Sequence, residues 1–179
     1  MLKVILISGK ARSGKDTAAG FIKEELESKG LSVLKINYAD YVKFICSKYF
    51  GCSSEKNEAS RSIWQYIGTD IIRKNNPDFW VKAVVDLVKV LEPENLFDVI
   101  IIPDTRFPNE ITYWMSEGYE VDTIRIIRED YVNDLTSSQK QHLSEIALDD
   151  YLFDYYFSAK TVERLRQKCK DYVEQCFCE

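Results

Sequence analysis

A glycine-rich loop near the start of the chain constrains the fold more than any other feature. The apolar run 4–7 leads into Gly9, and Gly14 and Lys15 follow with the spacing G-x-x-x-x-G-K. In such a loop successive backbone N–H groups turn towards phosphate oxygens, and the helix behind it adds its positive end. We therefore predict a phosphate-binding loop with Lys15 on the terminal phosphates. The residues predicted to bind nucleotide are Gly9, Ala11, Arg12, Ser13, Gly14, Lys15, Asp16 and Thr17.

Asp16 stands where such a loop normally has a serine or threonine. Its carboxylate could bind Mg²⁺ directly or through water, since hard cations favour carboxylate oxygen. It could equally serve only the first turn of the helix, where negative charge is favourable. Both interpretations stay open. Thr17 supplies a hydroxyl one position later, in reach of an α-phosphate.

Length and charge narrow the class of protein. A chain of 179 residues predicts one domain over 1–179, and the net charge of −5 argues against a nucleic-acid-binding domain. The five cysteines are odd in number and lack C-x-x-C spacing, which favours a reduced setting over a disulfide scaffold. No apolar run approaches the roughly 20 residues that span a bilayer. We expect a cytoplasmic protein that binds neither nucleic acid nor membrane.

Apolar runs alternate with helical stretches along the chain. The predicted strands are 2–8, 32–37, 98–102, 120–127 and 155–158. The predicted helices are 15–29, 40–50, 59–74, 79–91, 109–117 and 161–176. This alternation predicts an α/β fold of three layers, with a parallel sheet of about five strands and helices on both faces. Ligands of such sheets bind at the carboxyl ends of the strands, where Gly9, Asn37 and Asp104 begin their segments.

A second acid and an arginine follow the apolar run 98–102. Asp104 comes just past the predicted strand, where phosphate-loop enzymes place a second Mg²⁺ anchor. Arg106 is two residues further on, and a guanidinium can grip a phosphate with two hydrogen bonds. The alternatives are a turn-forming aspartate and a surface ion pair.

Other arginines could supply the positive charge that phosphoryl transfer needs. Arg73 and Arg128 are the stronger candidates, Arg12 lies within the phosphate loop, and Arg125 is the weakest. Each could instead be a solvated surface charge. The polar stretch that begins at Arg128 lacks clear periodicity, and we expect a short lid over about 128–143.

Aromatic residues and the single histidine admit two interpretations. Trp80 and Tyr38 could stack on a base, although core packing is the commoner role at such positions. His142 could be a packed or surface residue without a chemical role.

Taken together, the motifs resemble a known family. The segments "GKARSGKDTAA", "NYADYVK", "QYIGTD" with a following arginine and "FW", "PDTRFPNE" and "HLSEIALDDYLFDYYF" occur in that order. They resemble the phage-type deoxynucleoside monophosphate kinases, a branch of the nucleoside monophosphate kinase superfamily of P-loop proteins. The resemblance covers Val4 to about Phe157 and implies the P-loop NTPase fold.

The resemblance implies Mg²⁺-dependent transfer of the ATP γ-phosphoryl group to a (deoxy)nucleoside monophosphate. By position, Lys15 and Thr17 would contact ATP, and the acceptor would lie in a helical region over about 38–92. The implied acceptor residues are Asp40, Arg73, Trp80 and Arg106. From the residues themselves we predict Lys15, Arg106 and Arg128 as the catalytic residues, with Asp16 and Asp104 as the candidate Mg²⁺ ligands.

The chain departs from the family where a Pro-Leu pair is expected, since Tyr41-Val42 follows Asp40. Base specificity therefore stays open, and so does the oligomeric state, for which a homodimer is one candidate. One alternative is a P-loop kinase for another small acceptor, such as dephospho-coenzyme A or phosphomevalonate. Another is a non-catalytic ATP-binding regulatory module, although ATP binding alone does not need the arginines beyond the loop.

Overall fold

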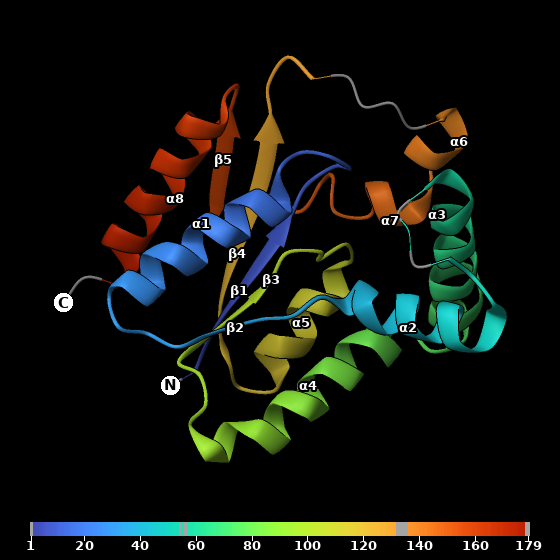
Figure 1. Cartoon of the computed structure of the whole chain (residues 1–179), viewed down its shortest axis with the longest axis horizontal. Helices are drawn as coiled ribbons and strands as arrows, with labels where there is room; N and C mark the ends of the chain where they lie inside the picture. The colour runs from blue at the N-terminus through green and yellow to red at the C-terminus, as the bar shows by residue number, and fades with distance from the viewer. Residues whose placement is uncertain (1, 54, 56, 132–135, 178–179) are drawn as a thin grey trace.

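A five-stranded parallel sheet forms the centre of the protein (Figure 1). The structure is a computed structural model that describes residues 2–53, 55, 57–131 and 136–177. The strands lie in the order β2-β3-β1-β4-β5, and every neighbouring pair is parallel. The strands are β1 (Lys3–Ser8), β2 (Val33–Lys35), β3 (Val99–Ile102), β4 (Glu120–Arg128) and β5 (Tyr155–Ala159).

Helices cover both faces of the sheet and extend from one end of it (Figure 1). The helices are α1 (Lys15–Ser28), α2 (Tyr38–Phe50), α3 (Glu58–Gln65), the π-helix η1 (Tyr66–Arg73), α4 (Phe79–Leu91), the 3₁₀ turn η2 (Glu92–Glu94), α5 (Pro108–Ser116), α6 (Ser137–Lys140), α7 (Leu143–Ile146) and α8 (Val162–Phe177). Helices α1 and α8 pack together on one face, and α4 and α5 pack on the other.

The alternation of side chains along β1 explains the two cores. Val4 and Leu6 belong to the core beneath α4 and α5, whereas Ile5 and Ile7 belong to the core beneath α1 and α8. Successive side chains of a strand point to opposite faces, so a continuous apolar run fits a strand that is buried on both sides. The four residues of β3 are apolar and buried for the same reason.

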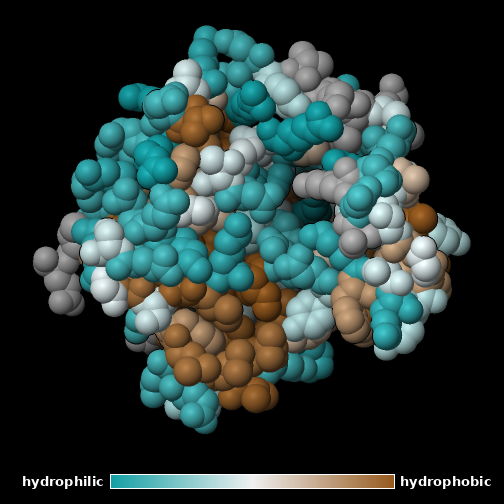
Figure 2. Space-filling model, in the orientation of Figure 1, coloured by the Kyte–Doolittle hydropathy of each residue, from teal (hydrophilic) through white to brown (hydrophobic). Residues whose placement is uncertain are grey.

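The expected fold class is confirmed, with local differences. The predicted helix 59–74 is an α-helix that continues as the π-helix η1, and β2 is shorter than predicted. The polar stretch after Arg128 contains the short helices α6 and α7, while residues 132–135 of the expected lid lie outside the described part. Within the described residues, no helix has the length and apolar character needed to cross a membrane. Apolar side chains gather over α4, where Leu87 and Val90 are exposed (Figure 2).

Candidate functional site

A cavity of about 490 Å³ opens at the carboxyl ends of β1 and β3. Its walls come from the phosphate loop with the start of α1, from α2, α3 and η1, from the segment after β3, and from α7. The predicted site residues that line it are Arg12, Gly14, Lys15, Asp16, Thr17, Arg73, Trp80, Asp104, Arg106 and Arg128. Segments far apart in the sequence therefore meet where ligands of parallel α/β sheets bind.

The phosphate loop has the backbone that its glycines allow. Gly9 has a φ of 150°, and a Cβ atom there would lie 2.6 Å from both the Ile126 carbonyl oxygen and Ser13 Oγ. Gly14 has a φ of 99°, a backbone conformation that residues with a Cβ atom rarely adopt. Arg12, the non-glycine exception in the loop, has a φ of 59°. The loop is thus packed so closely against β4 that only glycine fits at its first position.

Lys15 spans the phosphate loop from inside. Its Nζ donates hydrogen bonds of 2.7 Å to the carbonyl oxygens of Gly9 and Lys10, and its side chain is buried. Burial, together with the nearby Arg106 guanidinium, lowers the pKa of Lys15 to about 7. Anionic phosphate oxygens beside Nζ would favour the charged form again.

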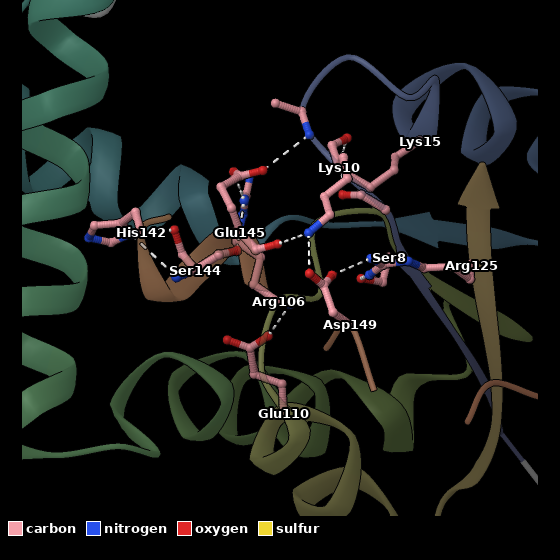
Figure 3. Close-up of polar contacts among 12 residues, drawn as sticks. Ser8, Lys10, Lys15, Arg106, Glu110, Arg125, His142, Ser144, Glu145 and Asp149 are labelled. Carbon is pink, nitrogen blue, oxygen red and sulfur yellow. Dashed lines mark hydrogen bonds and ion pairs between the residues drawn. The ribbon is translucent and has the colours of Figure 1, made fainter. Parts of the chain in front are cut away.

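Glu145, on α7, joins the phosphate loop to Arg106 (Figure 3). Its Oε2 accepts the Ala11 N–H at 3.2 Å, and its Oε1 pairs with the Arg106 guanidinium. Arg106 also donates to the Ser144 carbonyl oxygen at 3.1 Å. The Ala11 N–H therefore already has a hydrogen-bond partner in Glu145, although the sequence placed Ala11 among the residues predicted to bind nucleotide. The run H-x-S-E, which contributed to the family resemblance, was the available signal for Glu145.

A second set of polar contacts fixes the segment after α7. Asp149 pairs with Lys10 Nζ at 2.5 Å and with Arg125 at 2.9 Å. Arg125 also donates to Ser8 Oγ at 3.1 Å, at the end of β1. Arg125 therefore has a structural place beside the loop and does not line the cavity.

The two predicted metal ligands face the same cavity in different environments. Both oxygens of the Asp104 carboxylate accept backbone N–H groups at the start of α2, from Tyr38 at 3.1 Å and Ala39 at 2.8 Å. Burial raises the pKa of Asp104, although these hydrogen bonds oppose the rise. Asp16 is exposed in the first turn of α1, and no hydrogen bond to its carboxylate is found within the described part of the chain.

These two carboxylates fit Mg²⁺ only in company with a bound nucleotide. Among the described residues no group of three or more His, Cys, Asp or Glu side chains could hold a metal by itself. Mg²⁺, however, is usually bound in proteins by one or two carboxylates plus substrate phosphates and water. Asp16 and Asp104 line the cavity together with Lys15, which fits that pattern.

Arg73 is held in a buried cluster on the wall of the cavity. Its guanidinium lies 3.5 Å from the centre of the Phe107 ring, 3.4 Å from Glu110 Oε1, and in contact with Asn109. Glu110 also accepts the N–H groups of Arg106 and Phe107. Burial raises the pKa of Glu110 to about 7, against the effect of these N–H groups and of Arg73.

The remaining predicted residues differ in how they meet the cavity. Arg128 is exposed at the end of β4, near the Tyr131 ring at 4.2 Å. Trp80 is buried and donates its Nε1–H to the Gly68 carbonyl oxygen, so one side of its ring belongs to the core. Asp40 does not line the cavity, because as a first-turn acid of α2 it pairs with Lys43 at 2.9 Å and with Asn37. Its expected contact with the acceptor is therefore not supported by its position.

Sequence reasoning missed the polar wall that α3 and η1 present to the cavity. Arg61, Gln65 and Thr69 line it at intervals of four residues, and Arg73 continues the same spacing. Their side chains have no hydrogen-bond or ion-pair partner among the residues that the structure describes. The Trp64 Nε1–H between them is buried and likewise has no hydrogen-bond partner there. The four-residue spacing was the available signal.

No protein-family model and no curated protein sequence matches the chain. Among solved structures, it is similar to the APS kinase CysC of Mycobacterium tuberculosis in complex with AMPPNP and APS. The TM-score is 0.53 at 11% identity, over 97% of this chain and 98% of that one. A sugar kinase from Janibacter sp. gives a TM-score of 0.53 at 15% identity, over 98% and 96% of the two chains. Identities this low show a shared fold alone, which is the three-layer α/β P-loop fold.

Proposed function

We propose that the protein catalyses Mg²⁺-dependent transfer of the γ-phosphoryl group of ATP to a (deoxy)nucleoside monophosphate. One observation carries the proposal: a single cavity is lined by the phosphate-loop lysine and by five arginines, of which Arg73, Arg106 and Arg128 come from separate elements outside the loop. Positioning and positive charge around the moving phosphoryl group are the main requirements of this chemistry.

The ATP phosphates lie on the phosphate loop in this proposal. Backbone N–H groups of the loop and the positive end of α1 would hold the phosphate oxygens, and Lys15 would contact the terminal phosphates. Thr17 lines the cavity beside them and would reach the α-phosphate. Arg128, exposed at the end of β4, would neutralise negative charge from the lid side.

The acceptor phosphate lies between Arg106 and Arg73. Both guanidiniums are already oriented by carboxylates, Arg106 by Glu145 and Arg73 by Glu110. A preorganised guanidinium binds an anion with a smaller loss of side-chain entropy. The acceptor phosphate is itself an anionic nucleophile, so we assign no general base. Asp16 and Asp104 would hold Mg²⁺, which when bound would supply positive charge against the phosphates.

The polar wall favours a nucleoside over a smaller acceptor. Arg61, Gln65 and Thr69 offer hydrogen-bonding groups that the described protein does not use. The Trp64 Nε1–H is buried as well as unpaired, and buried polar groups rarely remain so. A base and a sugar carry donors and acceptors that can pair with these groups. Phosphomevalonate has no heteroaromatic ring to offer them.

Coupled ADP release with a panel of acceptors tests the proposal. The assay contains ATP and Mg²⁺ with the four common dNMPs, dephospho-coenzyme A or phosphomevalonate, and Lys15→Ala is the control. We expect turnover with at least one dNMP and its loss in the variant. Turnover only with a non-nucleotide acceptor would replace the proposed acceptor while keeping kinase chemistry. ATP binding without ADP release from any acceptor would favour a regulatory module.

A further inference from the structure

The start of α7 selects one tautomer of the His142 ring. Nδ1 accepts the Ser144 N–H at 3.3 Å and lies 2.8 Å from Ser144 Oγ. A backbone N–H can only donate, so Nδ1 carries no proton. The proton of the neutral ring is therefore on Nε2.

The Nε2–H group of His142 lies near the carboxylate of Asp70, a residue of η1. Nε2 is buried, has no hydrogen-bond partner among the described residues, and lies 3.5 Å from Asp70 Oδ1. Asp70 belongs to η1, directly after Thr69 and three residues before Arg73, both of which line the cavity. At 3.5 Å the contact is longer than an ordinary hydrogen bond, but the polar Nε2–H group and the Asp70 carboxylate are close enough to attract each other. The contact joins the N-cap residue of α7 to η1.

Through α7, His142 is also connected to the residues that we expect to hold phosphate. His142 is the N-cap residue of α7, whose Ser144 and Glu145 hold Arg106. Glu145 also accepts the Ala11 N–H of the phosphate loop. Figure 3 shows His142, Ser144, Glu145 and Arg106 as a continuous set of polar contacts. With Asp70 at one end and the Ala11 N–H at the other, these contacts run from η1 to the phosphate loop.

We propose that His142 is a positioning residue, which ties η1 to α7 through Asp70 and thereby fixes Arg106 for the acceptor phosphate. The proposal rests on the proposed function, because it assigns Arg106 to the acceptor. His142 itself does not line the cavity and touches no reacting atom. It acts by holding η1, which carries Thr69 and Arg73, in a fixed position relative to α7.

Two substitutions separate the contacts of His142. His142→Asn keeps an acceptor oxygen near the position of Nδ1, so α7 stays capped while the donor towards Asp70 is lost. His142→Gln places an amide N–H near the position of Nε2 and loses the cap instead. Asp70→Ala removes the partner carboxylate, which is half-exposed. Asp86→Ala, at an equally exposed aspartate of α4, is the matched control.

Steady-state kinetics with the preferred acceptor give the first measurement. We expect His142→Asn and Asp70→Ala each to lower kcat/KM for the acceptor about tenfold, with KM for ATP within about twofold of wild type. The double variant loses no more than either single one, because both remove the same contact. We expect His142→Gln to keep a higher kcat/KM for the acceptor than His142→Asn. Because it lacks the cap of α7, it should unfold at a lower urea concentration than His142→Asn. Losses that multiply in the double variant, or an unchanged His142→Asn, would overturn the proposal.

A second measurement does not depend on any acceptor. Amide hydrogen exchange at Ala11 in the unliganded protein reports whether Glu145 is in place, since Glu145 holds that N–H. We expect Asp70→Ala to raise this exchange several-fold over Asp86→Ala, although Asp70 touches neither residue. Equal exchange in the two variants would refute the link. A wild-type protein without turnover but with this difference would sink the proposed function and leave the link standing.

Discussion

Arg106 and Glu145 form an ion pair that joins the segment after β3 to α7, and the same Glu145 carboxylate accepts the Ala11 N–H of the phosphate loop. Glu145 is almost fully buried, whereas about a third of the Arg106 side chain is exposed towards the cavity. The guanidinium is thus oriented by the buried Glu145 on one side and remains accessible from the cavity on the other. One carboxylate sets the relative position of the nucleotide loop and of the arginine assigned to the acceptor.

Glu145→Gln should weaken acceptor use more than ATP binding. The amide oxygen can still accept the Ala11 N–H, but the variant loses the negative charge that orients Arg106. We expect acceptor kcat/KM to fall by about ten- to a hundredfold, the effect of losing a charge-assisted hydrogen bond. Steady-state kinetics with both substrates varied would check this. Glu117→Gln is the control, because Glu117 pairs with Lys89 and does not line the cavity. A loss confined to the KM for ATP would contradict the assignment.

Gly9→Ala and Gly20→Ala should have opposite effects on stability. The new Cβ at position 9 would lie 2.6 Å from the Ile126 carbonyl oxygen, whereas a Cβ at position 20 meets nothing within 4 Å. We expect Gly9→Ala to lower the free energy of unfolding by about 1–3 kcal/mol. Gly20→Ala, inside α1, should raise it by about 0.5–1 kcal/mol. Urea unfolding of both variants measures the difference, and a loop that tolerates alanine at position 9 would contradict the packing described.

Substitutions of Asp104 should separate its structural contact from its proposed metal contact. Asp104→Ala leaves the N–H groups of Tyr38 and Ala39 unpaired, and we expect a loss of about 1–3 kcal/mol in the free energy of unfolding. Asp104→Asn keeps one acceptor oxygen for these two N–H groups and removes the charge. It should lose less stability than Asp104→Ala and need about tenfold more Mg²⁺ for half-maximal activity. An unchanged Mg²⁺ requirement in Asp104→Asn would exclude Asp104 as a metal ligand.

Glu110 should make stability fall as pH rises through the range below neutrality. Burial raises its pKa from 4.5 to about 7 in the folded protein, so the folded state binds the proton more tightly than the unfolded state. Its contribution is therefore fully present below pH 4.5 and is lost as pH rises towards 7, by roughly 3 kcal/mol at most. Urea unfolding at pH 5 and pH 8 would show this loss in wild type. Glu110→Gln, which cannot ionise, should lack it, and an equal slope in both would refute the raised pKa.

The fold was largely predictable because its signals are local. The apolar runs of β1 and β3 and the glycine-rich loop each show their structure within a few residues. The strand order was not predictable, because it depends on which apolar run pairs with which. The π-helix η1 was also missed, since its residues have the composition of an ordinary helix and its geometry follows from packing.

The candidate site was predictable where a motif identified a single residue. Lys15, Asp104 and Arg106 line the cavity as their motifs implied. Partner choice was not predictable: Asp40 pairs with a lysine of its own helix, and Arg125 pairs with Asp149. These contacts depend on side-chain directions across the fold, which sequence spacing does not determine.

Transfer of a labelled γ-phosphoryl group is the most direct test of the central claim. ATP labelled at the γ-position is incubated with Mg²⁺, each dNMP and either the wild-type protein or Lys15→Met, a substitution of similar volume without charge. The account predicts that label appears in a deoxynucleoside diphosphate with wild type, and that the variant loses at least about a thousandfold in rate. Label that appears only as inorganic phosphate, or equal rates in the two proteins, would contradict it.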